Sequence, residues 1–409
     1  MSAPAATLFT PADSARFVGD VYSVSLMATL PLFAAIIAFV FLRQSSAGSR
    51  AVVWRCTVAG LLAIYLGRFV PWQWMAWVLP ELLARPLVAL GTVQLDVPPG
   101  VSRSGDAIRQ APGAIVGILL LYWTGVALVL IRTAIARLRL VRVRQTAVAL
   151  ATARWRRRLR EAGDATGVPT ATVRLFGSPD VPVPVTWGVW RPVILLPHSA
   201  SHWPADRLQA VLRHELAHVR GNDAAMRLAT RIACALFWFH PGVWWLARRF
   251  EADAEEACDD RVLLSGIRRS DYAEWLAAST PAGDHHLQAA MALSRPGNLR
   301  ARLDAVTDTR RLVTVPGRRM VFATVTLTAA IVAPLATARL APTREVLTSL
   351  MQETRWESRA WAVVRLAQRA DSVDVARSAA RHDPDPAVRA WARYALARGQ
   401  AAPAPRSRS

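Results

Sequence analysis

Residues 214–218 carry the pattern best suited to chemistry, the HExxH motif His214-Glu215-Leu216-Ala217-His218. On a helix, positions i and i+4 share one face, so both imidazoles can reach one zinc ion. Zinc lowers the pKa of a bound water to about 7, and Glu215 is placed to take the proton as a general base. Because the chain has only 8 histidines, a chance match is rare. The motif therefore predicts a catalytic zinc site for peptide-bond hydrolysis.

A catalytic zinc site needs a third protein ligand, and the acidic segment 255–259 supplies the best candidate. Glu255 and Asp259 are four residues apart, so on a helix they share a face. We expect Glu255 to bind zinc and Asp259 to accept a hydrogen bond from a ligand histidine. Glu251 and Glu256 are competing choices for the third ligand. Without the HExxH motif, the same acidic cluster would be interpreted as a solvated helix face.

Three further residues near these motifs have two interpretations each. Asp223 either supports a ligand histidine or caps the next helix. His240 either stabilises an oxyanion or has a structural role, which we favour. Cys258 is a zinc ligand in principle, but its setting beside Ala257 favours a small buried side chain.

The motif requires a helix, and the helical pattern begins at Pro204, with Ser201 as its predicted cap. The apolar face of Leu208, Val211 and Leu212 would anchor this helix in a core. Upstream, residues 146–170 predict a helix followed by a turn. Residues 173–175 and 193–196 predict short strands, and the proline-rich stretch 178–184 predicts an edge or a loop.

Four apolar segments are long enough to span a membrane, at about 20 residues per crossing. They cover residues 21–42, 52–71, 111–131 and 320–338. The second is the weakest because Arg55 and Arg68 interrupt it, and we expect these side chains to extend toward opposite interfaces. The tryptophans that follow, Trp72, Trp74 and Trp77, are typical of an interfacial belt.

Composition supports a membrane protein, with 53% hydrophobic and 19% charged residues. The net charge is +21, and every one of the 50 basic residues is arginine. The densest clusters flank apolar segments, which favours membrane interfaces over nucleic-acid binding. A basic run follows the third segment. The positive-inside rule therefore predicts both termini outside and residues 132–319 in the cytoplasm. The three cysteines form no disulfide framework.

The carboxyl-terminal region contains a weak internal repeat. Arg359-Ala360-Trp361 recurs as Arg389-Ala390-Trp391, and a helix-breaking Asp-Pro-Asp-Pro segment separates the copies. This pattern resembles a pair of HEAT-type helical repeats, and a plain helical hairpin fits it equally well.

The motifs together resemble the BlaR/MecR-type membrane metallopeptidases, the antirepressor receptors of bacteria. The resemblance rests on HELAHVRGND, on WFHPGVWWLARRFEADAEEACDDRVL and on the upstream GVWRPVILLP, and it covers roughly residues 20–340. It implies a gluzincin-type domain between a third and a fourth span, with His214, His218 and Glu255 as ligands and Glu215 as base. It also implies that the strand 192–197 lies beside the substrate. The implied substrates are the protein itself or winged-helix repressors in the cytoplasm.

One departure from the family concerns the sensor. The β-lactam receptors carry a penicillin-binding domain with a Ser-x-x-Lys nucleophile, and this sequence has no lysine. The apolar segments, the motifs and the resemblance together predict a polytopic α-helical membrane protein with a mainly α, α+β gluzincin-like peptidase domain and a helical tail. The predicted parts are a three-span domain at 1–140, a cytoplasmic zinc peptidase domain at 141–317, a fourth span at 318–340 and extracytoplasmic HEAT-like repeats at 341–409.

The motif predicts a membrane-bound zinc metalloendopeptidase, and the resemblance implies the bacterial cytoplasmic membrane and a role in transmembrane signalling. Its expected partners are the lipid bilayer, a cytoplasmic protein substrate and a protein bound by the tail, with no direct contact to nucleic acid. Self-cleavage near Arg310-Arg311 or Arg318-Arg319 is a further hypothesis. The alternative is a catalytically silent signalling scaffold that binds a partner through its HEAT-like tail.

Overall fold

A computed structural model describes residues 11–67, 112–278, 299–311, 313–337, 347–348, 351–352, 356–367 and 372–400. Within these residues the chain forms two compact units. One unit contains nearly all of the apolar amino-terminal helices, together with the sheet and the helices of the central region, and the other contains the carboxyl-terminal helices. The predicted Trp72–Trp77 belt and Arg68 lie outside the described residues.

Among the residues that the structure describes, three helices are long and apolar enough to cross a membrane. They are α1 (Pro11–Leu42), α2 (Ala47–Gly67) and α6 (Pro112–Thr146), which contain the candidate spans Val24–Leu42, Ala47–Gly67 and Val116–Thr146. These helices match the first three predicted spans. Helix α2 begins five residues earlier than predicted, and α6 continues through the arginine-rich segment to Thr146. Many large apolar side chains on α1 and α6 are exposed, as expected for surfaces that face lipid.

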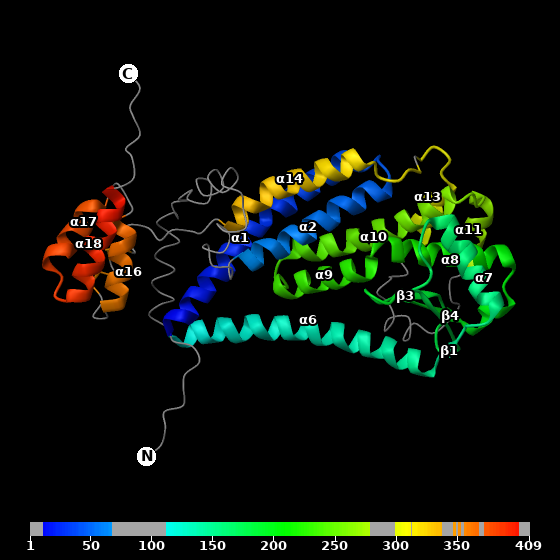
Figure 1. Ribbon diagram of the computed structural model, residues 1–409, viewed down its shortest axis with the longest axis horizontal. Helices are drawn as coiled ribbons and strands as arrows, with labels where there is room; N and C mark the ends of the chain where they lie inside the picture. The colour runs from blue at the N-terminus through cyan, green and yellow to red at the C-terminus, as the bar shows by residue number, and fades with distance from the viewer. Residues whose placement is uncertain are drawn as a thin grey trace, which may run out of the picture. The chain divides into compact units, whose positions relative to one another are not determined.

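The fourth predicted span forms helix α14 (Arg318–Thr337). It packs along α2, as Figure 1 shows. The two helices approach closely, because a Cβ atom on Gly60 would lie only 2.6 Å from a methyl group of Val332. Small residues allow this close approach between apolar helices. That α14 crosses the membrane stays a prediction.

A four-stranded sheet has the order β1-β2-β4-β3. Its strands are β1 (Val148–Ala149), β2 (Arg174–Ser178), β4 (Val193–Pro197) and β3 (Val185–Trp187). Strands β2 and β4 pair in parallel, and β1 and β3 pair antiparallel to their neighbours. The sequence predicted β2 and β4 but missed β1 and β3. The helix and turn predicted for residues 146–170 begin later than expected, since β1 precedes helix α7 (Ala153–Thr166), whose carboxyl-terminal cap is Gly167.

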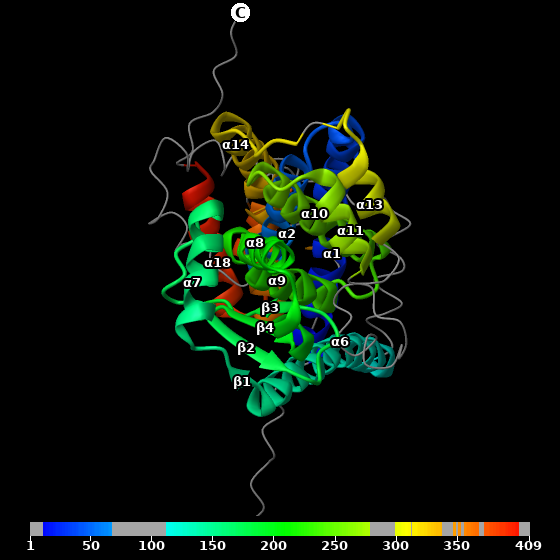
Figure 2. The same ribbon diagram turned by 90° about the vertical axis from the view of Figure 1, so that its right-hand side faces the viewer.

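Helices α7 and α8 (Ala205–Gly221) pack on the sheet (Figure 2). Their shared core includes Leu159 of α7, Ile194 and Leu196 of β4, and Leu208 and Leu212 of α8. The predicted apolar face of the motif helix is therefore buried as expected.

The predicted cap of the motif helix is wrong. The amino-terminal cap of α8 is Pro204, and Ser201 lies in the short 3-10 helix His198–His202, where its hydroxyl donates to the His198 carbonyl at 2.9 Å. Pro204 can take this place because the first helical N–H groups have no partner within the helix.

The described part of the central region also contains the helices α9 (Asp223–Leu236), α10 (Pro241–Leu264), α11 (Arg269–Ala278) and α13 (Leu299–Thr307). Helix α10 packs against both α8 and α2, so a candidate membrane span contributes directly to the core of this unit. The aromatic residues around the start of α10 strengthen the contact. Trp245 packs edge-on against Trp54 of α2, with ring centroids 5.5 Å apart.

In its described residues the carboxyl-terminal unit contains the helices α16 (Trp356–Ala367), α17 (Val373–His382) and α18 (Pro386–Gln400). They share one apolar core. The two copies of the sequence repeat fall on α16 and α18, and their arginines meet at one residue. Arg359 forms a buried ion pair with Asp383 at 3.1 Å, and Arg389 donates to the Asp383 carbonyl. The HEAT-type assignment stays a prediction.

Candidate metal centre

Helix α8 places the two motif histidines on one buried face. His214 and His218 are 9% and 7% exposed, and their ring centroids lie 4.9 Å apart. Leu212 and Leu216, on the same helix, are fully buried. The apolar residues therefore fix the rotation of the helix about its axis, and that rotation determines the direction of the histidine side chains.

A tight turn after α8 returns the chain to the second histidine. Asn222 adopts a left-handed conformation with φ of 52°, and it ends α8 and begins α9. Asp223 follows directly, and its Oδ2 lies 2.7 Å from Nδ1 of His218. Of the two interpretations of Asp223, this contact with His218 agrees with the first, and the role of His218 as a metal ligand stays a prediction. The carboxylate sets the tautomer that leaves Nε2 of His218 free to bind a cation.

Helix α10 brings Glu255 to both histidines. Its two carboxylate oxygens lie 3.5 Å from Nε2 of His214 and 3.5 Å from Nε2 of His218. All three ligand atoms lie within 4.8 Å of one another. Tetrahedral zinc with bonds of about 2.0–2.1 Å needs neighbouring ligand atoms roughly 3.3 Å apart. The three side chains therefore fit one zinc ion.

The competing glutamates of α10 have other partners. Glu251 forms an ion pair with Arg231 at 2.7 Å. Glu256 forms ion pairs with Arg50 at 2.8 Å and with Arg311 at 3.0 Å. Neither carboxylate reaches the histidines in the described contacts, so Glu255 is the glutamate of α10 that the fold directs at them.

Asp259 lies one helical turn beyond Glu255 and contacts His214. Its Oδ1 is 3.1 Å from Nδ1 of His214. The hydroxyl of Tyr272 donates to the same oxygen at 2.6 Å and lies 3.0 Å from Nδ1 of His214. Asp259 and Asp223 thus act in parallel ways, each holding the Nδ1 atom of one histidine so that both Nε2 atoms turn toward Glu255.

Two arginines compensate the buried carboxylates. Arg302 of α13 donates to both oxygens of Asp259 at 2.8 and 2.7 Å and lies 3.2 Å from Glu255. Arg227 of α9 pairs with Glu255 at 2.8 Å. These positive charges explain how several acidic groups can lie together in a buried region.

The charges of the site follow from these contacts. Burial alone would raise the pKa of Glu255, but the neighbouring His218, His214 and Arg302 lower it well below its usual value. Burial lowers the pKa of His214, yet hydrogen bonds with Asp259 and Glu255 outweigh this effect and raise it to about 9. Glu255 is therefore a carboxylate, which is the form that binds a cation.

Glu215 is held by a strand that the sequence did not predict. The hydroxyl of Thr186 on β3 donates to Oε2 of Glu215 at 2.6 Å. The resemblance placed the strand 192–197 beside the substrate. That strand is β4, which pairs with β2 on one side and β3 on the other. In the described part of the chain, β3 is the last strand of the sheet on this side.

Sequence reasoning missed Thr186, Tyr272, Arg227 and Arg302. Nothing in the sequence separates Arg227 or Arg302 from the other arginines of a chain with 50 basic residues. Thr186 follows the pair of prolines that concealed β3. Tyr272 is one of only 5 tyrosines, and its position soon after the acidic segment is the one signal that pointed to it.

His240 and Cys258 have structural surroundings. Nδ1 of His240 accepts a hydrogen bond from the Gly242 N–H at 3.1 Å, so His240 caps the start of α10. Cys258 is buried, with its sulfur 3.3 Å from Nδ1 of His218. Burial raises the pKa of this thiol well above its usual value. A neutral thiol is a weak ligand, and the sulfur lies near the Nδ1 atom that Asp223 already engages.

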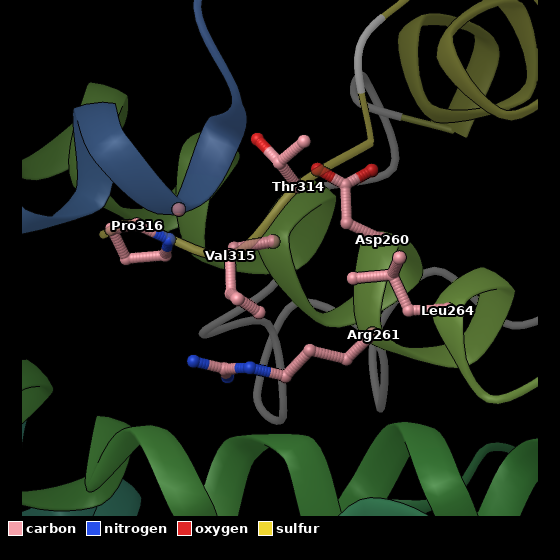
Figure 3. Close-up of a pocket in the computed structure, with 8 residues that line it drawn as sticks. Asp260, Arg261, Leu264, Thr314, Val315 and Pro316 are labelled. Carbon is pink, nitrogen blue, oxygen red and sulfur yellow. The ribbon is translucent and has the colours of Figure 1, made fainter. Parts of the chain in front are cut away.

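A small hollow lies elsewhere on α10, near the start of α2 (Figure 3). It is lined by Gly48, Ala257, Asp260, Arg261, Leu264, Thr314, Val315 and Pro316. None of the predicted site residues lines it.

Comparison with known proteins finds one matching family model and several curated relatives. The model described as BlaR1 peptidase M56 matches residues 99–306. The regulatory protein BlaR1 of Bacillus licheniformis is 37% identical over 91 residues, which is 22% of this chain and 15% of that protein. The methicillin resistance mecR1 protein of Staphylococcus aureus is 26% identical over 87 residues, 21% of this chain and 15% of that protein. The aligned segments thus span only about a seventh of each relative.

Proposed function

The chain belongs to the BlaR1 peptidase M56 family, and we propose that it is a membrane-bound zinc endopeptidase that cleaves cytoplasmic proteins in transmembrane signalling. The observation that carries the proposal is the convergence of His214, His218 and Glu255 beside Glu215, with ligand atoms within 4.8 Å of one another. A signalling role is suggested by the relatives, one of which is named a regulatory protein.

The chemistry is assigned to four side chains and their supports. When bound at His214, His218 and Glu255, zinc would supply a Lewis acid for the scissile carbonyl and activate the attacking water. Glu215 takes the proton from that water and later delivers it to the leaving amine. Thr186 fixes one carboxylate oxygen of Glu215, so the other oxygen is free to serve as the base.

The edge of the sheet offers a place for the substrate. Strand β3 ends the described sheet beside Glu215. An extended peptide can add to such an edge through main-chain hydrogen bonds. This arrangement would bring a peptide carbonyl close to the histidines and would favour unfolded or flexible segments of protein substrates.

The membrane arrangement is part of the same proposal. We place three spans in residues 1–140, the zinc peptidase domain at 141–317 in the cytoplasm, a fourth span at 318–340 and a HEAT-like tail at 341–409 outside. The candidate spans in α1, α2 and α6 support the first part. We propose two candidate substrates. One is a winged-helix repressor, and the other is the chain itself, cleaved at Arg310-Arg311 or Arg318-Arg319.

Zinc analysis of the full chain purified in detergent tests the proposal. Wild type should hold about one zinc ion per chain, His214→Ala should lose it and Glu255→Gln should bind it weakly. Glu251→Gln is the matched control, because Glu251 lies one turn earlier on α10 and pairs with Arg231. It should retain zinc.

Cleavage is then followed by mass spectrometry after expression. A fragment that forms with wild type and is absent with Glu215→Gln would support peptidase activity. Zinc-free wild type would overturn the zinc site. Two outcomes would favour the scaffold alternative. Either the wild-type chain binds zinc but gives no fragments, or wild type and Glu215→Gln give the same fragments.

A further inference from the structure

Helix α2 touches the metal centre on two sides, although it is one of the candidate membrane spans. On one side, Arg55 donates to Oδ1 of Asp223 at 2.6 Å. The other oxygen of Asp223 lies 2.7 Å from Nδ1 of His218. A direct chain of polar contacts therefore joins a membrane helix to a metal ligand through one buried carboxylate. This differs from the expectation that Arg55 extends along the helix toward an interface.

On the other side, α2 holds the helix that carries Glu255. Arg50 donates to Oδ1 of Asp253 at 2.9 Å and to Glu256 at 2.8 Å. Trp54 donates its ring N–H to Oδ2 of Asp253 at 2.5 Å. Both oxygens of Asp253 are thus bound by α2, two residues before Glu255.

The turn between α8 and α9 is shaped to admit the arginine. A Cβ atom on Gly221 would lie 2.7 Å from Oδ1 of Asp223 and 3.0 Å from Nη2 of Arg55. Any side chain at this position would push the pair apart. Asp223 is only 1% exposed, so its negative charge depends on these partners rather than on water.

We propose that Arg55 is a positioning residue for the metal ligand His218, acting through Asp223, and that α2 thereby couples a membrane span to the metal centre. The inference rests on the proposed function only in requiring that the site binds zinc. Without the guanidinium, Asp223 loses a hydrogen-bond partner and its carboxylate is held less firmly in one orientation. His218 then loses the fixed acceptor that directs its Nε2 atom toward Glu255.

A displacement of α2 would act on both ligands at once, since α2 contacts Asp223 beside His218 and Asp253 beside Glu255. Coupling of this kind is reciprocal. Metal binding should therefore strengthen the association of α2 with α9 and α10, and a signal that moves α2 should change metal affinity or activity.

The test measures Zn²⁺ affinity of the full detergent-purified chain by competition with a chromophoric chelator. Arg55→Met should weaken affinity by about tenfold to a hundredfold, the range typical for partners of metal-binding histidines. Arg231→Met is the matched control. Arg231 is 25% exposed, as Arg55 is, and forms an ion pair of 2.7 Å with Glu251 on α10. The zinc affinity of Arg231→Met should stay near that of wild type.

Three readouts separate positioning from a general structural role. Arg55→Lys should restore part of the affinity, because lysine keeps the charge without the planar fork. With Co²⁺ in place of zinc, the visible absorption of the bound ion should change in Arg55→Met and stay unchanged in Arg231→Met. If Arg55 acts through Asp223, then Arg55→Met should add no further loss in an Asp223→Asn background.

The inference is overturned if Arg55→Met binds zinc as Arg231→Met does, or if its loss adds fully to that of Asp223→Asn. Should Arg55→Met fail to fold, the same double-mutant cycle with Arg55→Lys decides. Zinc-free wild type would overturn this inference and the zinc site together. Zinc binding without peptidase activity would overturn the proposed function alone.

Discussion

Arg302 holds Asp259 with two parallel hydrogen bonds, from Nε to Oδ2 at 2.8 Å and from Nη2 to Oδ1 at 2.7 Å. This fork is the strongest geometry available to an arginine and a carboxylate. The two residues are 43 positions apart in the sequence. Helix α13 therefore closes the metal centre from a distant part of the chain, behind the carboxylate that orients His214.

Replacement of Arg302 by methionine should damage both stability and metal binding. It leaves the buried charge of Asp259 without its main partner, and such a loss typically costs about 3–5 kcal/mol. Zinc affinity should fall by about tenfold or more because His214 loses its fixed acceptor. Arg269→Met is the control, since Arg269 also anchors α13, through the Val306 and Asp308 carbonyls, without touching the site. Equal zinc affinity in the two variants would contradict the role of Arg302.

Thr186→Val should reduce peptidase activity while zinc content stays at the wild-type level. The change removes the 2.6 Å hydrogen bond to Glu215 and leaves the shape of the side chain nearly unchanged. Misorientation of the base should lower kcat/KM by roughly tenfold or more. Thr186→Ser keeps the hydroxyl and should retain most of the activity. Steady-state cleavage of a peptide substrate measures the effect, and activity of Thr186→Val equal to that of wild type would show that the contact is dispensable.

Zinc affinity should rise with pH up to about 9. Without metal, the pKa of His214 is raised to about 9, so His214 carries a proton at neutral pH that zinc must displace. Below this pKa each unit of pH should strengthen binding about tenfold, and above it the dependence should weaken. Asp259→Asn removes the main source of the raised pKa and should move the plateau to lower pH. Chelator competition across this range measures the slope, and a flat profile below pH 9 would contradict the assignment.

Cys258→Ser should retain about one zinc ion per chain. His218, Asp223 and Cys258 form a second group of neighbouring atoms that could hold a metal ion, but the raised pKa of the buried thiol disfavours the thiolate. The variant keeps the size of the side chain and removes the sulfur ligand. Zinc content measured beside Glu255→Gln decides between the groups. Loss of zinc in Cys258→Ser with retention in Glu255→Gln would assign the metal to the cysteine.

Several parts of this protein were predictable from the sequence because short-range spacing encodes them. The interval of four residues between His214 and His218, and between Glu255 and Asp259, places each pair on one helix face. Apolar length identified α1, α2 and α6, and β-branched residues identified β2 and β4. Strand β3 was missed because Pro182 and Pro184 precede it and favour a loop.

Tertiary structure alone decided which distant side chains meet. The sequence favoured Glu255 as the third ligand but left Glu251 and Glu256 as competing choices, because spacing within α10 does not reveal which face of that helix turns toward α8. It also predicted that Arg55 extends toward a membrane interface, whereas packing of α2 on the peptidase core brings it to Asp223. A chain with 50 arginines offers many equivalent ion pairs. Local patterns thus determine the helices and strands and the chemical groups that they carry. Only the packing of those elements selects the charged partners, because long-range contacts depend on which faces are buried and which elements lie close together, and short-range spacing does not encode either.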